Sequence, residues 1–97
     1  MKRQEIYEKA IRLWGVDLQL GMAIQEMAEL TKEITEYWRS KVGSHYREIA
    51  IGKMQNEIAD VEIMMAQLRM MFDTKAITKK KSRKIRRLIK RIERDTH

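Results

Sequence analysis

The stretch LQLGMAIQEMAELTKEITEYWRS, residues 18–40, decides the fold class of this chain. Its apolar residues recur every three or four positions, which is the period of an amphipathic α-helix. The whole 97-residue chain contains no proline and only 4 glycines. An all-β fold needs more turn residues than that between its strands. The sequence therefore predicts an all-α protein.

Three further helices are expected around this central one. The predicted spans are Arg3–Trp14, Leu18–Ser40, 45–72 and Thr78–Arg94. Gly15 ends the first helix, Asp17 is expected to cap the second and Ser44 the third. Gly52 is a candidate break in the third, because glycine costs about 1 kcal/mol relative to alanine in a helix. The chain length predicts a single domain, residues 1–97, built as an antiparallel four-helix bundle.

Charge is distributed unevenly along the chain. The formal net charge is +7, yet residues 1–74 hold 10 basic and 12 acidic residues. Residues 75–97 hold 11 basic and 2 acidic residues, a net charge of +9. A basic C-terminal helix of about residues 78–94 predicts a polyanionic partner: nucleic acid, an anionic surface or a polyphosphate ligand. A basic helix face that is simply solvated is the alternative.

Several classes of protein are excluded or disfavoured by composition. There is no cysteine, so disulfides and thiolate metal sites are excluded. No apolar run approaches the ~20 residues of a membrane span, so no membrane partner is expected. Glu5 and Glu8 interrupt the N-terminal apolar stretch, which does not resemble a signal peptide. We expect a cytoplasmic protein, because that compartment suits a cysteine-free chain.

Carboxylates border the apolar faces of two predicted helices. At about 100° per residue, Glu26 and Glu29 lie on a stripe beside the apolar face of residues 18–40. Glu57 falls inside the apolar arc of the third helix, and Asp60 falls at its edge. If the two apolar faces pack together, with Trp38 in the core, these four carboxylates converge.

Converging carboxylates are costly to bury and raise one another's pKa values, which a divalent cation would relieve. Their hard oxygen ligands suit Mg²⁺ or Mn²⁺. The alternative is that these acids are surface groups that pair with Lys32, Lys53 or the basic tail. A second apolar patch at Ile63 and Met70, away from the main seam, predicts a contact with another subunit.

The order of these motifs resembles the MazG-like all-α nucleoside triphosphate pyrophosphohydrolases, in particular their small phage and bacterial members. The family signature is EExxE followed by ExxD. The matching segments here are Gln25-Glu26-Met27-Ala28-Glu29, Asn56-Glu57-Ile58-Ala59-Asp60, the lead-in Trp14-Gly15 with Gln19-Leu20, and the basic close Lys84-Ile85, Arg87-Leu88 and Arg91-Ile92. The chain departs from the family at Gln25, where the signature has its first acid.

The resemblance implies hydrolysis of NTP or dNTP to the monophosphate and pyrophosphate by metal-activated water. It implies Mg²⁺, with Mn²⁺ as the alternative, and assembly into a homodimer or homotetramer. Carried over residue by residue, the metal ligands are Glu26, Glu29, Glu57 and Asp60. Glu26 or Glu29 is the candidate catalytic base. The candidate substrate-binding residues are Gln19, Lys53, Lys84 and Arg87.

Two other functions compete with this interpretation. The first is a nucleic-acid-binding helical module that uses the basic C-terminal helix, with a steep salt dependence. The second is a structural helical oligomer whose acidic site is a relict. The enzyme is favoured, because a nucleic-acid binder has no use for four acids turned toward its core.

Overall fold

The computed structural model describes residues 1–96, which form four α-helices and no strand. The helices are α1 (Arg3–Trp14), α2 (Val16–Arg39), α3 (His45–Met71) and α4 (Thr74–Asp95). The predicted all-α class is confirmed. No helix in the described part of the chain has the length and apolar character needed to cross a membrane.

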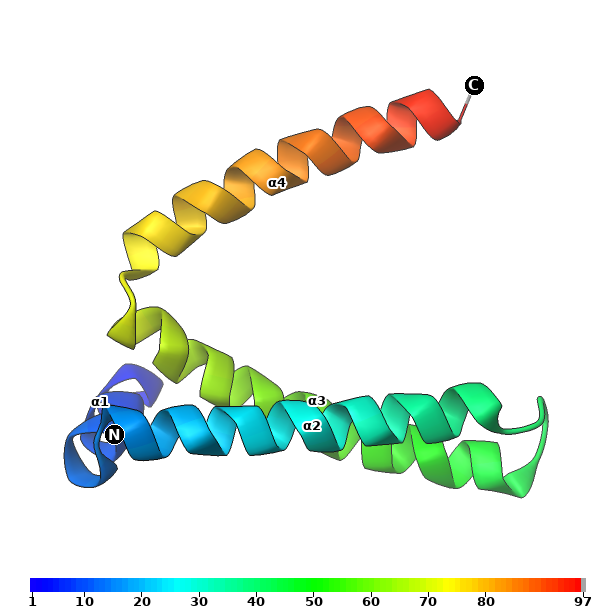
Figure 1. The fold of residues 1–97 in the computed structure, drawn as a ribbon, viewed down its shortest axis with the longest axis horizontal. Helices are drawn as coiled ribbons and strands as arrows, with labels where there is room; N and C mark the ends of the chain where they lie inside the picture. The colour runs from blue at the N-terminus through cyan, green and yellow to red at the C-terminus, as the bar shows by residue number, and fades with distance from the viewer. Residues whose placement is uncertain (97) are drawn as a thin grey trace.

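Helices α2 and α3 run antiparallel to each other and form a long hairpin, and α1 lies across one end of it (Figure 1). Residues at heptad spacing make the seam between α2 and α3. They are, on α2, Gln19, Ala23, Glu26, Leu30, Glu33 and Tyr37 and, on α3, Ala50, Met54, Glu57, Val61, Met64 and Leu68, all buried or half-buried. Buried apolar side chains are few, with only Ala23, Ala50 and Met64 in this class among residues 1–96.

The seam of α2 differs from the predicted one. It is turned by about 80° from the centre of the apolar face, so Gln19, Glu26 and Glu33 face α3 together with Leu30 and Tyr37. Several larger apolar side chains of α2, such as Ile24 and Ile34, stay on the outside, and Trp38, expected in the core, is 82% exposed. These side chains stay exposed because α3 is the main neighbour of α2 and covers only one side of it. On α3, Glu57 lies in the seam as predicted.

The helix boundaries follow from local capping. Gly15, with φ +88°, joins α1 directly to α2, so Asp17 lies in the first turn of α2 and does not cap it. The Ser44 side chain accepts a hydrogen bond from the backbone N–H of Arg47 at 3.2 Å, which confirms it as the cap of α3. Helix α3 continues through Gly52 without a break.

Helix α4 begins at Thr74, four residues earlier than predicted, and projects away from the hairpin (Figure 1). Within residues 1–96 it contacts α3 alone. The antiparallel arrangement therefore holds for α2 and α3, while the four helices do not close into one bundle within a single chain. The apolar stripe of α4 stays 46–53% exposed at Ile85, Leu88, Ile89 and Ile92.

The direction of α4 is fixed by an elbow of hydrogen bonds around Asp73, whose φ of +73° is rare for a residue other than glycine. The Asp73 carboxylate accepts from the backbone N–H of Ala76 at 3.2 Å and so caps α4. The Arg69 guanidinium donates to the carbonyl of Thr74 and to the hydroxyl of Thr78, and the Thr74 hydroxyl donates to the carbonyl of Arg69. This network ties the last turn of α3 to the first turn of α4.

Candidate metal centre

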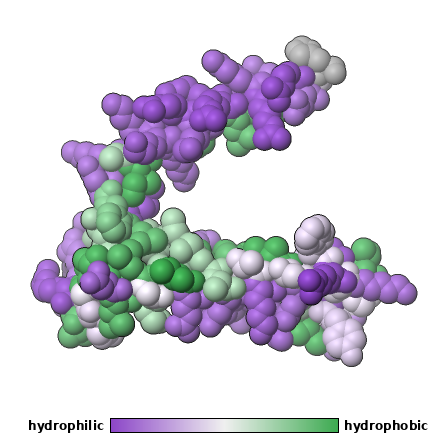
Figure 2. Space-filling view, in the orientation of Figure 1, coloured by the Kyte–Doolittle hydropathy of each residue, from purple (hydrophilic) through white to green (hydrophobic). Residues whose placement is uncertain are grey.

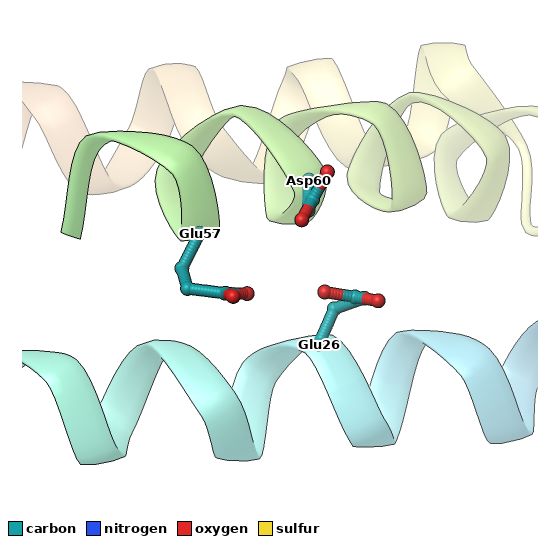
Figure 3. A group of neighbouring side chains, drawn as sticks. All are labelled: Glu26, Glu57 and Asp60. Atoms are coloured by element: carbon teal, nitrogen blue, oxygen red, sulfur yellow. The ribbon is translucent and has the colours of Figure 1, made fainter. Parts of the chain in front are cut away.

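Three carboxylates from two helices meet in the middle of the hairpin. Glu26 projects from α2, and Glu57 and Asp60 project from α3, one turn apart, so that the three side chains point toward one another (Figure 3). One oxygen from each side chain can be chosen so that all three lie within 4.8 Å of one another. A Mg²⁺ ion with bonds of ~2.1 Å holds neighbouring ligand oxygens about 3–4 Å apart. Small side-chain adjustments therefore suffice for these residues to share one cation.

The electrostatic environment of Glu57 is unfavourable to its ionised form. Desolvation raises the pKa of Glu57 from 4.5 to about 7, helped by a hydrogen bond with Glu26 and by the negative charges of Glu29, Glu26 and Asp60. One oxygen of Glu26 and one of Glu57 are buried without any hydrogen-bond partner. Buried polar atoms normally have such a partner. The group of three carboxylates thus lacks a positively charged neighbour, and a divalent cation would supply that charge.

The ion pairs with lysines that were considered as the alternative do not form in the described part of the chain. No ion pair within 4.0 Å joins Glu26, Glu57 or Asp60 to a basic side chain in the described part of the chain. The ion pairs that do form are surface pairs elsewhere, such as His45 with Glu48 at 3.8 Å. The three carboxylates therefore face one another with no positive side chain between them.

Two further acids of α2 extend the site. Glu29 is half-buried and lies close enough to raise the pKa of Glu57, yet it stands outside the group of three. Glu33 was not among the predicted ligands, but its Oε2 atom is buried and unpartnered, like the corresponding atoms of Glu26 and Glu57. The signal was present in the sequence, because Glu33 lies seven residues after Glu26 and so on the same stripe of the helix.

Gln19 occupies a different environment from the predicted substrate site. Its side chain is 4% exposed, and its Nε2 donates to Oε1 of Gln67 at 2.6 Å. This buried amide pair lies toward the α1 end of the seam, among apolar neighbours such as Trp14, Leu18 and Ile63. Gln19 is thus engaged within the hairpin and is not part of the acidic group.

The three predicted basic residues are divided between two places. Lys53 is exposed, one turn before Glu57, and lines a groove of about 580 Å³ between the end of α2 and the start of α3. Lys84 and Arg87 line a hollow of about 260 Å³ on α4. Since α4 touches α3 only near the elbow, a single chain does not bring Lys84 and Arg87 to the carboxylates.

The geometry makes the hairpin a candidate site for a divalent cation with oxygen ligands. No protein-family model matches the chain, and comparisons with curated proteins and with solved structures also found no match.

Proposed function

We propose that this chain is a Mg²⁺-dependent nucleoside triphosphate pyrophosphohydrolase of the MazG-like type, which converts NTP or dNTP to the monophosphate and pyrophosphate. The convergence of Glu26, Glu57 and Asp60 without a positive partner is the observation that carries the proposal. The order of the two acidic motifs in the sequence supports the family assignment. Mn²⁺ is the alternative cation, since it accepts the same oxygen ligands.

In this proposal the seam acids hold the cation, and neighbouring side chains complete the site. Glu26, Glu57 and Asp60 are the ligands, and Glu29 is a further ligand or the base. A bound Mg²⁺ supplies charge neutralisation for the phosphates and makes water a better nucleophile. Lys53, one turn from Glu57, contributes positive charge for the phosphate chain.

The bond changes of the reaction are simple. A water oxygen forms a bond to the α-phosphorus, and the bond from that phosphorus to its bridging oxygen breaks, so that pyrophosphate leaves. The water proton passes to Glu29 or Glu26. Little covalent chemistry is required of the protein, because positioning and electrostatic stabilisation provide most of the catalysis in phosphoryl transfer.

The functional unit in this proposal is a homodimer or homotetramer, in which helices of more than one chain complete the bundle. The support is the amount of apolar surface that one chain leaves exposed, visible as green areas over the hairpin in Figure 2. Contiguous exposed apolar surface of this kind is typical of protein–protein contacts.

The test is pyrophosphate release from a panel of NTPs and dNTPs with Mg²⁺. Glu57→Gln and Asp60→Asn should each lower the rate by at least about 100-fold, because each removes a ligand charge. Glu62→Gln is the matched control, since Glu62 is an exposed acid of α3 outside the group. Circular dichroism should show unchanged helix content in all three variants. Equal rates in the cluster variants and the control would refute the proposed site.

The second candidate function is nucleic-acid binding by α4. The observation in its favour is that α4 projects from the hairpin with its basic residues exposed along its length (Figure 2). Retention of DNA that falls steeply with salt, with no pyrophosphate released from any nucleotide, would favour this function over hydrolysis.

A further inference from the structure

Helix α4 carries its basic and its apolar residues on opposite sides. The 11 basic residues of the segment 75–97 all lie on α4. At about 100° per residue, all of them except Lys81 fall within one arc of about 180° around the helix. The stripe of Ile85, Leu88, Ile89 and Ile92 is centred about 180° from the middle of that arc. We call the basic residues of α4 other than Lys81 the basic arc.

The basic arc is open to solvent along the helix. Every residue from Thr78 to Asp95 is exposed. In Figure 2, the green atoms visible on α4 lie on the side turned toward the hairpin, and the side turned away is purple. Within residues 1–96, the only ion pairs of α4 are those of Asp95 with Arg91 and Arg94. The rest of the basic arc therefore has no carboxylate partner in the described part of the chain.

One flank of the basic arc forms a small basic hollow. Lys84, Arg87 and Arg91, together with Leu88, line a volume of about 260 Å³ there. Basic side chains grouped in this way are typical contacts of phosphate groups in nucleic acids. The hollow thus gives Lys84 and Arg87 a role that does not require them to reach the carboxylates of the seam.

The charge of the rest of the chain limits where a polyanion can approach. Residues 1–74 carry net charge −2, whereas residues 75–97 carry +9. Because α4 projects from the hairpin and its basic arc is turned outward, a polyanion on this arc stays away from the acidic seam (Figures 1 and 2). Complementary charge therefore favours an anionic partner on the outer side of α4.

An anionic lipid surface fits this arrangement poorly. An amphipathic helix binds such a surface by burying its apolar side in the headgroup region. The apolar stripe of α4 is turned toward the hairpin, so the hairpin stands between the stripe and a flat surface (Figures 1 and 2). The outward side of α4 offers charge alone, which is what a phosphate backbone needs.

Among nucleic acids, the shape of α4 favours a B-form duplex. The helix contains no aromatic residue, and proteins that bind single strands stack the bases on aromatic side chains. The major groove of an A-form RNA duplex is too narrow and deep for side chains to read. The major groove of B-form DNA is about 12 Å wide and admits an α-helix, whose diameter is about 10–12 Å. An arc of about 180° faces both walls of such a groove at once.

We propose that α4 binds double-stranded DNA in the major groove, with the basic arc on the phosphates of both strands and the apolar stripe outside the groove. Arg83 and Lys90 lie near the middle of the arc, and Lys84 and Arg86 lie near its two edges, where the two backbones run. Phosphate contacts carry no sequence information, so the binding is independent of sequence. This inference rests on the second candidate function and names its partner, and it requires neither metal nor hydrolysis.

The first experiment measures binding of the unmodified chain, without metal or nucleotide, to a labelled DNA duplex of about two helical turns by fluorescence anisotropy. The duplex should bind at least about 10-fold more tightly than either of its strands or than an RNA duplex of the same sequence. The dissociation constant should rise steeply with NaCl concentration. Absence of binding at low salt, or equal or tighter binding of a single strand or of the RNA duplex, would overturn the proposal.

A pair of triple variants tests whether the basic arc makes the contacts. Arg83→Gln, Arg86→Gln and Lys90→Gln together should lower the slope of log Kd against log salt by about 2–3, since each lost phosphate contact removes about 0.9. The control variant removes the same charges from exposed positions of α1, by the substitutions Arg3→Gln, Lys9→Gln and Arg12→Gln. Its slope should change by less than about 1. Equal slope changes in the two variants would contradict the assignment to α4.

The groove is identified by dimethyl sulfate footprinting with the unmodified chain. This reagent methylates guanine at N7 in the major groove and adenine at N3 in the minor groove. At saturating protein, methylation of guanine N7 should fall while that of adenine N3 stays unchanged, and the opposite pattern would overturn the proposal. Release of pyrophosphate from a nucleotide by a chain that binds no DNA would leave the catalytic proposal standing and this one refuted.

Discussion

Binding of Mg²⁺ should displace a proton from Glu57. The metal-free pKa of this residue is raised to about 7, chiefly by desolvation and then by the neighbouring carboxylates. A divalent cation requires the ionised carboxylate, so saturation with metal must remove the proton wherever it is present. From a pKa of about 7, the fraction protonated is roughly 0.9 at pH 6, 0.5 at pH 7 and 0.1 at pH 8. The expected release is therefore about half a proton per chain at pH 7.

The assay is calorimetric titration with MgCl₂ in several buffers. The slope of the observed binding enthalpy against the ionisation enthalpy of the buffer gives the number of protons released. Release should fall as pH rises from 6 to 8. Glu57→Gln should abolish most of it, whereas Glu62→Gln should leave it unchanged. A proton release near zero at pH 6, or one that is independent of pH, would refute the proposal that Glu57, with its raised pKa, is a ligand of the cation.

The same pKa shift sets the pH dependence of stability in the metal-free protein. A group with a folded-state pKa above its unfolded value binds its proton more tightly in the folded state. The stabilisation by protonated Glu57 is thus complete below about pH 4.5 and is lost as the pH rises through about 7. Added Mg²⁺ should restore the free energy of unfolding that is lost above pH 7. Glu57→Gln should remove this pH dependence of stability.

Other predictions concern the stability of the hairpin, measured by urea denaturation at fixed protein concentration. Gln67→Ala should destabilise by about 1–3 kcal/mol because it strands the buried amide of Gln19, and Gln19→Leu with Gln67→Leu should recover part of that loss. Gly52→Ala should stabilise by about 0.5–1 kcal/mol, since nothing lies within 4 Å of the added Cβ. Gly15→Ala should destabilise by about 1–3 kcal/mol, because a φ of +88° with a ψ of 158° is adopted almost only by glycine. Ser44→Ala should cost about 1 kcal/mol through loss of the α3 cap. Opposite signs for the two glycine variants are the sharpest check, and the same sign for both would contradict the argument from backbone conformation.

The sequence allowed prediction of the parts of the fold that depend on local rules. Helical period and the lack of proline predicted four helices, and the Ser44 cap and the seam position of Glu57 follow from spacing alone. The rotation of α2 was not predictable in the same way. The apolar arc of α2 is wider than the surface that one neighbouring helix covers. The sequence therefore did not determine which part of this arc packs against α3. In the structure, the edge of the arc that carries Glu26 and Glu33 packs there.

The elbow shows a second limit of reasoning from one sequence. A helix start at Thr78 was expected, whereas α4 starts at Thr74 because Asp73 adopts a positive φ and caps it. A single backbone dihedral and the hydrogen bonds of Arg69 set the direction of 22 residues. Periodicity carries no information on that angle, so the positions of Lys84 and Arg87 relative to the carboxylates did not follow from it.

In the proposed function, the composition of the seam gives metal binding and self-association separate sources of stability. A hairpin whose seam holds Glu26, Glu33 and Glu57, with buried unpartnered oxygens, gains little from burial and loses from desolvation. Its larger apolar side chains lie on other sides of the helices, where a single chain leaves them exposed. In the proposed function, cation binding at the seam and association through exposed apolar side chains should stabilise the folded state by separate amounts. We expect the melting temperature to rise with protein concentration in the absence of Mg²⁺ and to rise further, by a similar increment at each concentration, when Mg²⁺ is added. An increment that vanishes at high protein concentration would mean that the cation acts through the interface and not at the seam.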